Sequence, residues 1–127
     1  MGTISAETRP FTILTSNATR ELSEALKRRC LYLWLDYPSL EREKTIVMSR
    51  VPNMEEKLAA DIVRVVRSLR TMDLKKAPSI AETLDWAQTL LELGIDDINS
   101  ETVAPTLGSL LKHPSDIDKA RTERFTE

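Results

Sequence analysis

The sequence predicts a mainly α-helical chain, in which an incomplete α/β piece of two strands and one helix, residues 1–38, precedes a bundle of about four helices, residues 39–127. Three observations predict this class. Two short apolar runs near the start flank a stretch of helical pattern. Beyond Pro38 the apolar residues recur with the helical period. The chain also has only 3 glycines and 6 prolines, too few for a fold with many β-turns.

The two apolar runs of the first piece are expected to be buried strands. Residues 11–15 are apolar or β-branched and lie between Pro10 and the polar pair Ser16 and Asn17. Residues 30–35 form a nearly continuous apolar run that residues 36–38 terminate. Two strands joined by a helix normally run parallel, in a larger sheet. We therefore expect part of a larger fold, whose open edges pair with another copy or with each other.

A helix of about ten residues is expected between these strands. Thr19 is its candidate N-cap, and Leu22, Ala25 and Leu26 fall on one face. The basic residues 27–29 end it, where cations meet the negative carbonyl end of the helix.

The first two helices of the predicted bundle follow Pro38. Ser39 is the expected N-cap of one helix, which Pro52 stops. Asn53, with Glu56 three residues later, is typical of the start of the next. The apolar stripe of this second helix consists of Leu58, Ile62, Val65, Val66, Leu69 and Met72.

Two further helices and a short one complete the bundle. Ser79 and Glu82 form a capping-box pattern, and Gly94 is the expected stop of the helix that they begin. The next helix spans about residues 100–112, which requires Pro105 to lie in its first turn. The charged residues from Ser115 onward are expected to form a short helix.

Composition excludes several classes of protein. The net charge of −2 argues against a general polyanion binder. The single cysteine, Cys30, excludes an internal disulfide and indicates a reducing, cytoplasmic setting. No apolar run is long enough to cross a membrane. Two local basic groups remain, residues 27–29 and a set opposed only by Asp73, either of which could be a solvated helix face. That second set is Arg64, Arg67, Arg70, Lys75 and Lys76.

Few residues suit catalysis. The only histidine, His113, precedes Pro114 and is interpreted as a cation at a helix end, and no metal site is expected. The sequence contains no G-x-x-x-x-G-K-[ST] loop and no apolar run ending in Asp-Glu, so we expect no turnover by this chain alone. Asn17 follows a predicted strand, where α/β folds bind ligands, although it could merely cap the next helix. Arg28 and Arg29 could stabilise a transferring phosphoryl group or merely the helix dipole.

Taken together, these segments resemble a known family. FTILTSN at 11–17, RELSEALKRR at 20–29 and CLYLWLDYP at 30–38 resemble the sensor-1 and arginine-finger region of MoxR-type AAA+ ATPases, in particular the CoxD-like branch found beside carbon monoxide dehydrogenase genes. KAPSIAETLDW at 76–86 resembles part of that branch's lid domain. The resemblance extends from about residue 2 to about residue 121 and is most specific over 11–38.

The resemblance implies roles for particular residues. Asn17 would position the water that attacks ATP, and Arg29, or else Arg28, would be the finger that reaches a neighbouring subunit's site. Asn17, Ser79 and Lys76 would contact the nucleotide. Ala81 stands where many AAA+ lids have the sensor-2 arginine, and Lys75 or Lys76 could replace it.

The resemblance also implies a setting for the chain. It would be the carboxy-terminal part of an ATPase whose Walker A and Walker B segments come earlier, binding ATP and Mg²⁺ only in the longer protein. Partners would be neighbouring subunits of a ring, expected to be a hexamer, and a von Willebrand factor A domain protein, in chaperone-like maturation of a metalloenzyme. The alternative is a helical interaction or DNA-binding module using the basic face of Arg64, Arg67 and Arg70, although nucleic acid is not the expected partner.

Overall fold

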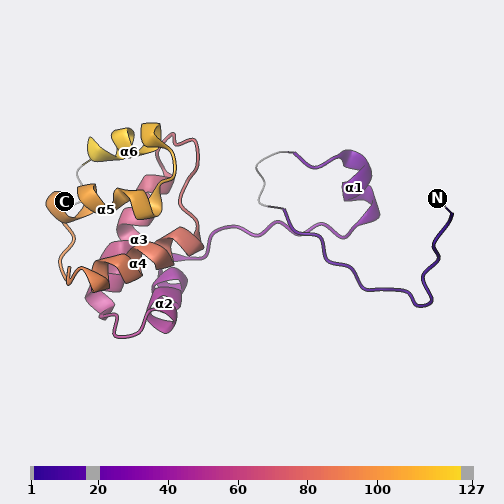
Figure 1. Ribbon diagram of the computed structural model, residues 1–127, viewed down its shortest axis with the longest axis horizontal. Coiled ribbons are helices and arrows are strands. Elements are labelled where there is room, and N and C mark those ends of the chain that lie inside the picture. The colour runs from indigo at the N-terminus through magenta and orange to yellow at the C-terminus, as the bar shows by residue number, and fades with distance from the viewer. Residues whose placement is uncertain (1, 17–20, 124–127) are drawn as a thin grey trace. The chain divides into compact units, whose positions relative to one another are not determined.

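The computed structural model describes residues 2–16 and 21–123 and divides the chain into two compact units, Met1–Asp36 and Tyr37–Glu127 (Figure 1). Over these described residues it contains six helices and no strand. The first unit holds one short helix, α1 (Glu24–Arg29). The second unit is a helical bundle, as the sequence predicts for the residues after Pro38.

The prediction of an α/β piece at residues 1–38 is wrong. Residues 11–15 and 30–35 have no strand assignment, and their apolar side chains face solvent, with exposed fractions of 92% for Phe11 and 104% for Leu31. A strand requires a neighbouring strand whose backbone forms hydrogen bonds with its own N–H and C=O groups. The rest of the described chain offers these two segments no such neighbour. An apolar pattern predicts that a segment is suited to a sheet, but it does not supply the rest of the sheet.

Helix α1 forms between these two segments but starts later than predicted. Ser23 is its N-cap, and the Ser23 hydroxyl oxygen accepts a hydrogen bond from the amide of Leu26 at 3.2 Å. Thr19, the predicted cap, lies outside the described residues. Lys27, Arg28 and Arg29 occupy the last turn, as expected, where their charges oppose the helix dipole.

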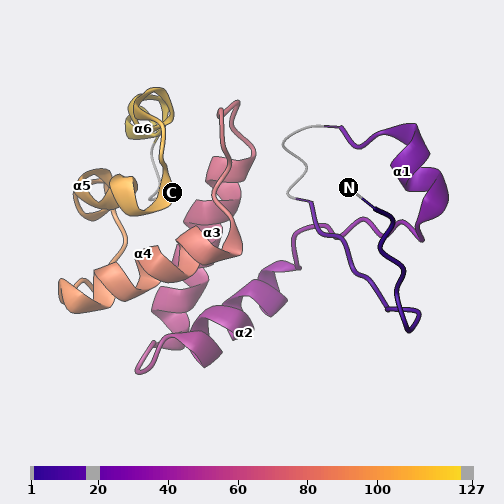
Figure 2. The same cartoon turned by 45° about the vertical axis from the view of Figure 1, so that its right-hand side comes forward.

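The second unit contains five helices: α2 (Leu40–Arg50), α3 (Glu56–Arg70), α4 (Ile80–Glu92), α5 (Ser100–Leu110) and α6 (Pro114–Arg121). Helix α2 packs on α3, α4 packs on α5 and also touches α2 and α3, and α6 packs on α5. Figure 1 shows α6, α5, α4 and α2 following one another down the unit with α3 behind them, and Figure 2 shows α3 crossing behind α4.

The core lies between these five helices. Helix α3 has the most pronounced apolar stripe and buries seven residues. Trp86 of α4 is fully buried, and its indole N–H donates to Thr106 Oγ1 of α5 at 2.8 Å. This bond satisfies the indole donor inside the core, so α4 and α5 are fixed in register as well as packed together.

The helix ends follow local sequence rules with two exceptions. Helix α4 ends in a Schellman motif: Gly94 has φ 68°, and the amides of Gly94 and Ile95 donate to the carbonyls of Leu91 and Leu90. Asn53 was expected to begin α3 but has φ 64° in the turn before it, a conformation that asparagine tolerates. Pro105 lies inside α5 and not in its first turn.

Pro105 is tolerated there because of its surroundings. A proline inside a helix leaves the carbonyl four residues earlier without a donor, here that of Glu101. Glu101 and Pro105 are both exposed, so water can reach this carbonyl. Asn99 secures the start of α5 through its side-chain oxygen, which accepts from the amides of Glu101 and Thr102.

Candidate functional site

The predicted site residues fall in both units. Asn17 lies outside the described residues. Arg28 and Arg29 are exposed in the last turn of α1, in the first unit. Lys76 and Ser79 precede α4, in the second unit, and the structure brings these two together. The start of α4 is therefore the part of the predicted site whose geometry can be described.

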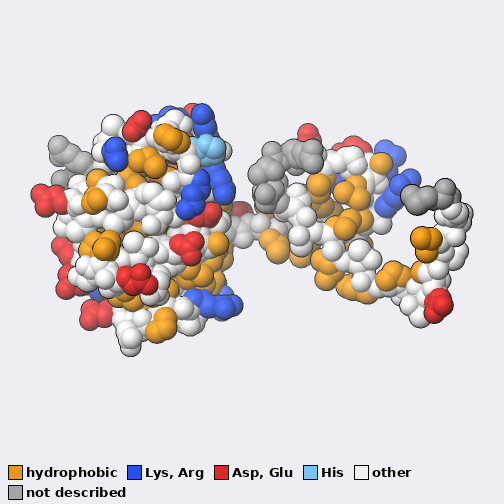
Figure 3. Space-filling model, viewed as in Figure 1, with side chains coloured by type: hydrophobic (Ala, Val, Ile, Leu, Met, Phe, Trp, Pro, Cys, Tyr) orange, Lys and Arg blue, Asp and Glu red, His pale blue; other side chains and the backbone are white. Residues whose placement is uncertain are grey.

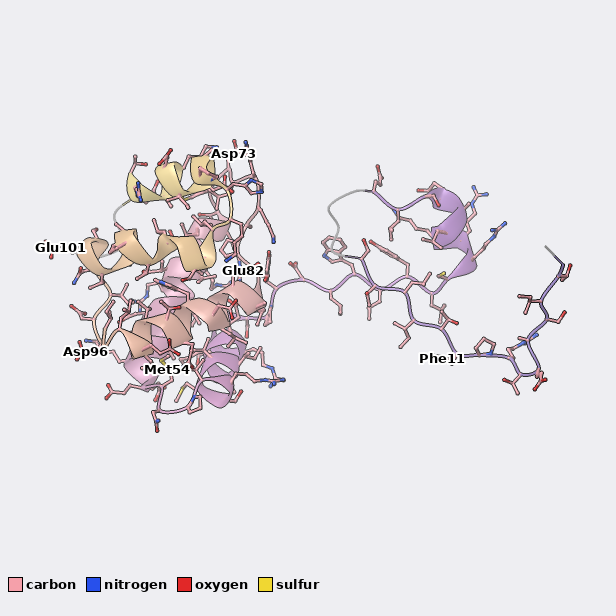
Figure 4. All side chains as sticks on the ribbon, viewed as in Figure 1. Phe11, Met54, Asp73, Glu82, Asp96 and Glu101 are labelled. Atoms are coloured by element: carbon pink, nitrogen blue, oxygen red, sulfur yellow. The ribbon has the colours of Figure 1, made fainter. Side chains whose placement is uncertain are left out.

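Glu82 organises the start of α4 (Figure 4). Its Oε2 accepts from the Ser79 amide at 3.0 Å and from the Ser79 hydroxyl, which confirms the predicted capping box. Its Oε1 lies 3.4 Å from Lys76 Nζ. Burial raises the pKa of Glu82, but the hydrogen bonds from Ser79 and the charge of Lys76 outweigh this and lower it to about 2. Glu82 is thus ionised, and the Ser79 hydroxyl is engaged in capping.

A buried aspartate that sequence reasoning missed holds the loop before α4. Asp116, in the first turn of α6, is fully buried. Its Oδ1 accepts from the backbone amide of Lys75 at 2.8 Å and its Oδ2 from that of Lys76 at 3.1 Å. Burial alone would raise its pKa. The two amides, with His113 and Lys119 nearby, lower the pKa of Asp116 below its usual value instead.

The Asp116 carboxylate accepts hydrogen bonds from backbone amides, and basic side chains lie at the surface around it. Lys75, Lys76, His113 and Lys119 are all exposed. Figure 3 shows blue side chains gathered beside the histidine at this end of the bundle. Lys119 Nζ also donates to the carbonyl of Asp73 at 2.6 Å, which ties α6 to the start of the loop. The result is a basic corner formed by Lys75 and Lys76 on the loop before α4 and by His113 and Lys119 of α6 and its N-cap.

His113 lies at a helix end, as expected. It is the N-cap residue of α6, and its carbonyl accepts from the amides of Asp116 and Ile117.

The sequence pattern that could have identified Asp116 is Pro114 followed two residues later by an acid, since proline favours the first helical position and acids favour the first turn. Local pattern alone does not show that Asp116 reaches a loop some forty residues earlier in the chain.

The three arginines of α3 do not form a free basic face. Arg64 Nη1 lies 2.7 Å from Asp61 Oδ1. Arg67 Nη1 lies 3.3 Å from one oxygen of Glu43, and Arg70 Nη1 lies 2.6 Å from the other. Glu43 has an exposed fraction of 1% and the Arg70 side chain 7%. Because all three arginines are paired with acidic side chains, and Arg70 is also buried, the structure provides no support for a DNA-binding surface on α3.

Comparison with known proteins returned nothing: no family model matches this chain, and no similar curated protein or solved structure was found. No helix in the described residues has the length and apolar character needed to span a membrane. Within the same residues, no cluster of three or more His, Cys, Asp or Glu side chains could hold a metal ion.

Proposed function

We propose that this chain supplies the arginine finger and the helical lid of a AAA+ ATPase of the MoxR type. The support is the resemblance of residues 11–38 and 76–86 to that family, together with the helical bundle after Pro38. The phosphate-binding loop of such an enzyme is not in this sequence. The chain alone would therefore bind ATP weakly and would not hydrolyse it.

One observation contributes most to this proposal. In many AAA+ lids the sensor-2 arginine stands at the start of the third helix and faces the nucleotide. Here α4 is the third helix after Pro38, and Arg70 links its start to the first residue of the second unit. Arg70 Nε donates to the carbonyl of Pro78 at 2.8 Å, and its guanidinium lies 3.9 Å from the centroid of the Tyr37 ring.

The residues at the start of α4 fit a phosphate group in part. Lys75 and Lys76 provide exposed cations where Ala81, also exposed, replaces the sensor-2 arginine. Ser79 fits less well, because its hydroxyl already donates to the ionised Glu82. In the proposed enzyme Asn17 orients the attacking water and Arg29, or Arg28, stabilises charge in the adjacent subunit's site. ATP and Mg²⁺ would be held mainly by residues outside this sequence.

The proposed setting follows from the same resemblance. The ATPase would form a cytoplasmic ring, a hexamer in the simplest case. It would act as a chaperone-like remodeller in metalloenzyme maturation with a von Willebrand factor A domain protein as partner.

Mixed rings of the longer ATPase test the finger assignment. Arg29→Ala should reduce ATP turnover on the order of a thousandfold while ATP binding remains. Because the finger acts on a neighbour, mixing these subunits with subunits whose phosphate-binding loop is inactivated should restore part of the turnover. Arg28→Ala, assayed in parallel, decides between the two arginines.

The control is Arg42→Ala on α2, an exposed arginine outside the proposed site, which should leave turnover unchanged. Full activity of the Arg28→Ala/Arg29→Ala double variant would refute the finger role. A coding region with no G-x-x-x-x-G-K-[ST] within a hundred or so residues upstream would refute the ATPase itself.

A further inference from the structure

Six residues form a contact cluster where the second unit begins: Tyr37, Pro38, Glu43, Arg67, Arg70 and Pro78. Arg70 is its centre. Nη1 donates to Glu43 of α2, Nε donates to the carbonyl of Pro78 before α4, and the guanidinium stacks on Tyr37. Arg67 donates from Nη1 both to Glu43 and to the carbonyl of Pro38 at 3.0 Å. Two arginines of α3 therefore hold the first two residues of the unit and the residue before the α4 N-cap.

The cluster is unbalanced in both charge and hydrogen bonding. Two guanidinium groups share one carboxylate, so the cluster carries one excess positive charge. Arg70 Nη2 is buried and has no hydrogen-bond partner among the described residues. The Tyr37 ring covers the guanidinium, yet it is itself 47% exposed and thus lies at the surface. If the ring moved away, water could reach Nη2, and this hydration would offset part of the lost stacking.

We propose that Tyr37 and Arg70 form a latch that couples the chain segment joining the two units to the start of α4. In the closed state the ring of Tyr37 holds the Arg70 guanidinium in the orientation in which Nε reaches the Pro78 carbonyl. When the joining segment pulls Tyr37 away, the guanidinium gains solvent and rotamer freedom, and its hold on Pro78 weakens. Lys76 and the Ser79–Glu82 capping box, which flank Pro78, then become less ordered.

The latch is a property of this chain alone. Only its use rests on the proposed function: in an ATPase it would relay movement of the core to Lys75 and Lys76 at the nucleotide. Arg70 is then a positioning residue, since it acts through Pro78 and not by contact with the substrate.

Amide hydrogen exchange of the 127-residue chain, followed residue by residue by NMR, tests the latch. In Tyr37→Leu the amides of Lys76, bonded to Asp116, and Thr83, bonded to the Ser79 carbonyl, should exchange about tenfold faster, as expected for a cation–π contact. Tyr37→Phe keeps the ring over the Arg70 guanidinium and should therefore exchange more slowly than Tyr37→Leu. The amides of Val103 and Leu111 in and after α5 serve as internal references and should not change.

Two further variants separate the latch from general stability. Arg70→Lys keeps a charge near Glu43 but cannot donate to Pro78 in the same geometry, so it should show the exchange pattern of Tyr37→Leu. Arg64→Met removes an exposed ion pair from the same helix and should leave all four amides unaffected. An unchanged rate at Lys76 and Thr83 in Tyr37→Leu, or an equal increase at Val103 and Leu111, would overturn the proposal. Loss of ATPase activity in mixed rings would not affect these outcomes, and the exchange results would not affect the ATPase test.

Discussion

Two buried carboxylates, Glu43 and Asp116, show how single residues secure the second unit. Each is removed from water, and each is compensated by donors from distant parts of the chain: Glu43 by two arginines of α3, and Asp116 by two backbone amides of the loop before α4. Neither role is visible in the sequence, where both residues stand in charged stretches typical of solvated surface. Because both carboxylates are buried and hydrogen-bonded to distant donors, they fix the positions of α2, α6 and the loop before α4.

Acid should lower the free energy of unfolding of the second unit, because Glu82 and Asp116 become protonated. Both have pKa values lower in the folded chain than their usual 4.5 and 3.8, to about 2 for Glu82. A carboxylate whose pKa is lowered on folding contributes stability above its unfolded pKa, and the contribution disappears as pH falls through the folded value. Urea unfolding should therefore show a falling midpoint as pH drops from about 4.5 towards about 2.

Glu82→Gln should lose less stability over this range, because the residue no longer titrates. Glu101→Gln at an exposed position of α5 is the matched control and should follow the wild-type curve. A pH dependence identical in Glu82→Gln and wild type would show that the Ser79–Glu82 contact contributes nothing.

At the scale of elements, local signals predicted the helices well. Ser39 caps α2, and Ser79 forms a capping box with Glu82 at the start of α4, because these contacts join residues only three positions apart. Gly94 ends α4 for the same local reason. The same kind of pattern at Asn53 and Glu56 did not predict the N-cap of α3, which is Glu55. The two predicted strands failed because a strand is completed by a neighbour distant in sequence, and neither residues 11–15 nor 30–35 find one in the described chain.

Two glycines should respond to the same substitution with opposite signs. Gly94 has φ 68°, so Gly94→Ala places a Cβ in the left-handed region and should destabilise the chain by about 1 kcal/mol or more. Gly108 lies inside α5 with open space where a Cβ would lie, so Gly108→Ala should stabilise by about 0.5–1 kcal/mol. Thermal and urea unfolding of both variants measure this, and a stabilising Gly94→Ala would contradict the Schellman assignment.

At the scale of the whole molecule, the two units differ in how much they bury. The second contains all of the buried core found in the described residues, whereas the first exposes large apolar side chains, including Leu33, Trp34 and Leu35 at 77%, 61% and 79%. A contiguous exposed apolar segment of this kind favours association with another surface. The second unit should therefore be the folding unit of this chain, and the first the source of its association.

The polypeptide of residues 37–127 should accordingly fold alone with the midpoint of the full chain and elute as a monomer. The 127-residue chain should associate as its concentration rises. A polypeptide of residues 39–127 lacks Tyr37 and Pro38, contacts of Arg70 and Arg67, and should unfold earlier than residues 37–127. Circular dichroism and light scattering decide both points, and an unfolded 37–127 would contradict the division into units.

The sequence by itself determined the helices of the bundle, the N-caps Ser39 and Ser79, the Gly94 stop and the apolar stripe of α3, because these depend on residues within one or two turns of each other. It also provided the resemblance on which the proposed function depends. The tertiary structure alone decided that Glu43 and Asp116 are buried, that Arg70 of α3 faces inward and that residues 11–15 and 30–35 lack a sheet. These features depend on partners from 24 to 41 positions away or absent from the described chain, and hydrophobic periodicity contains no information about them.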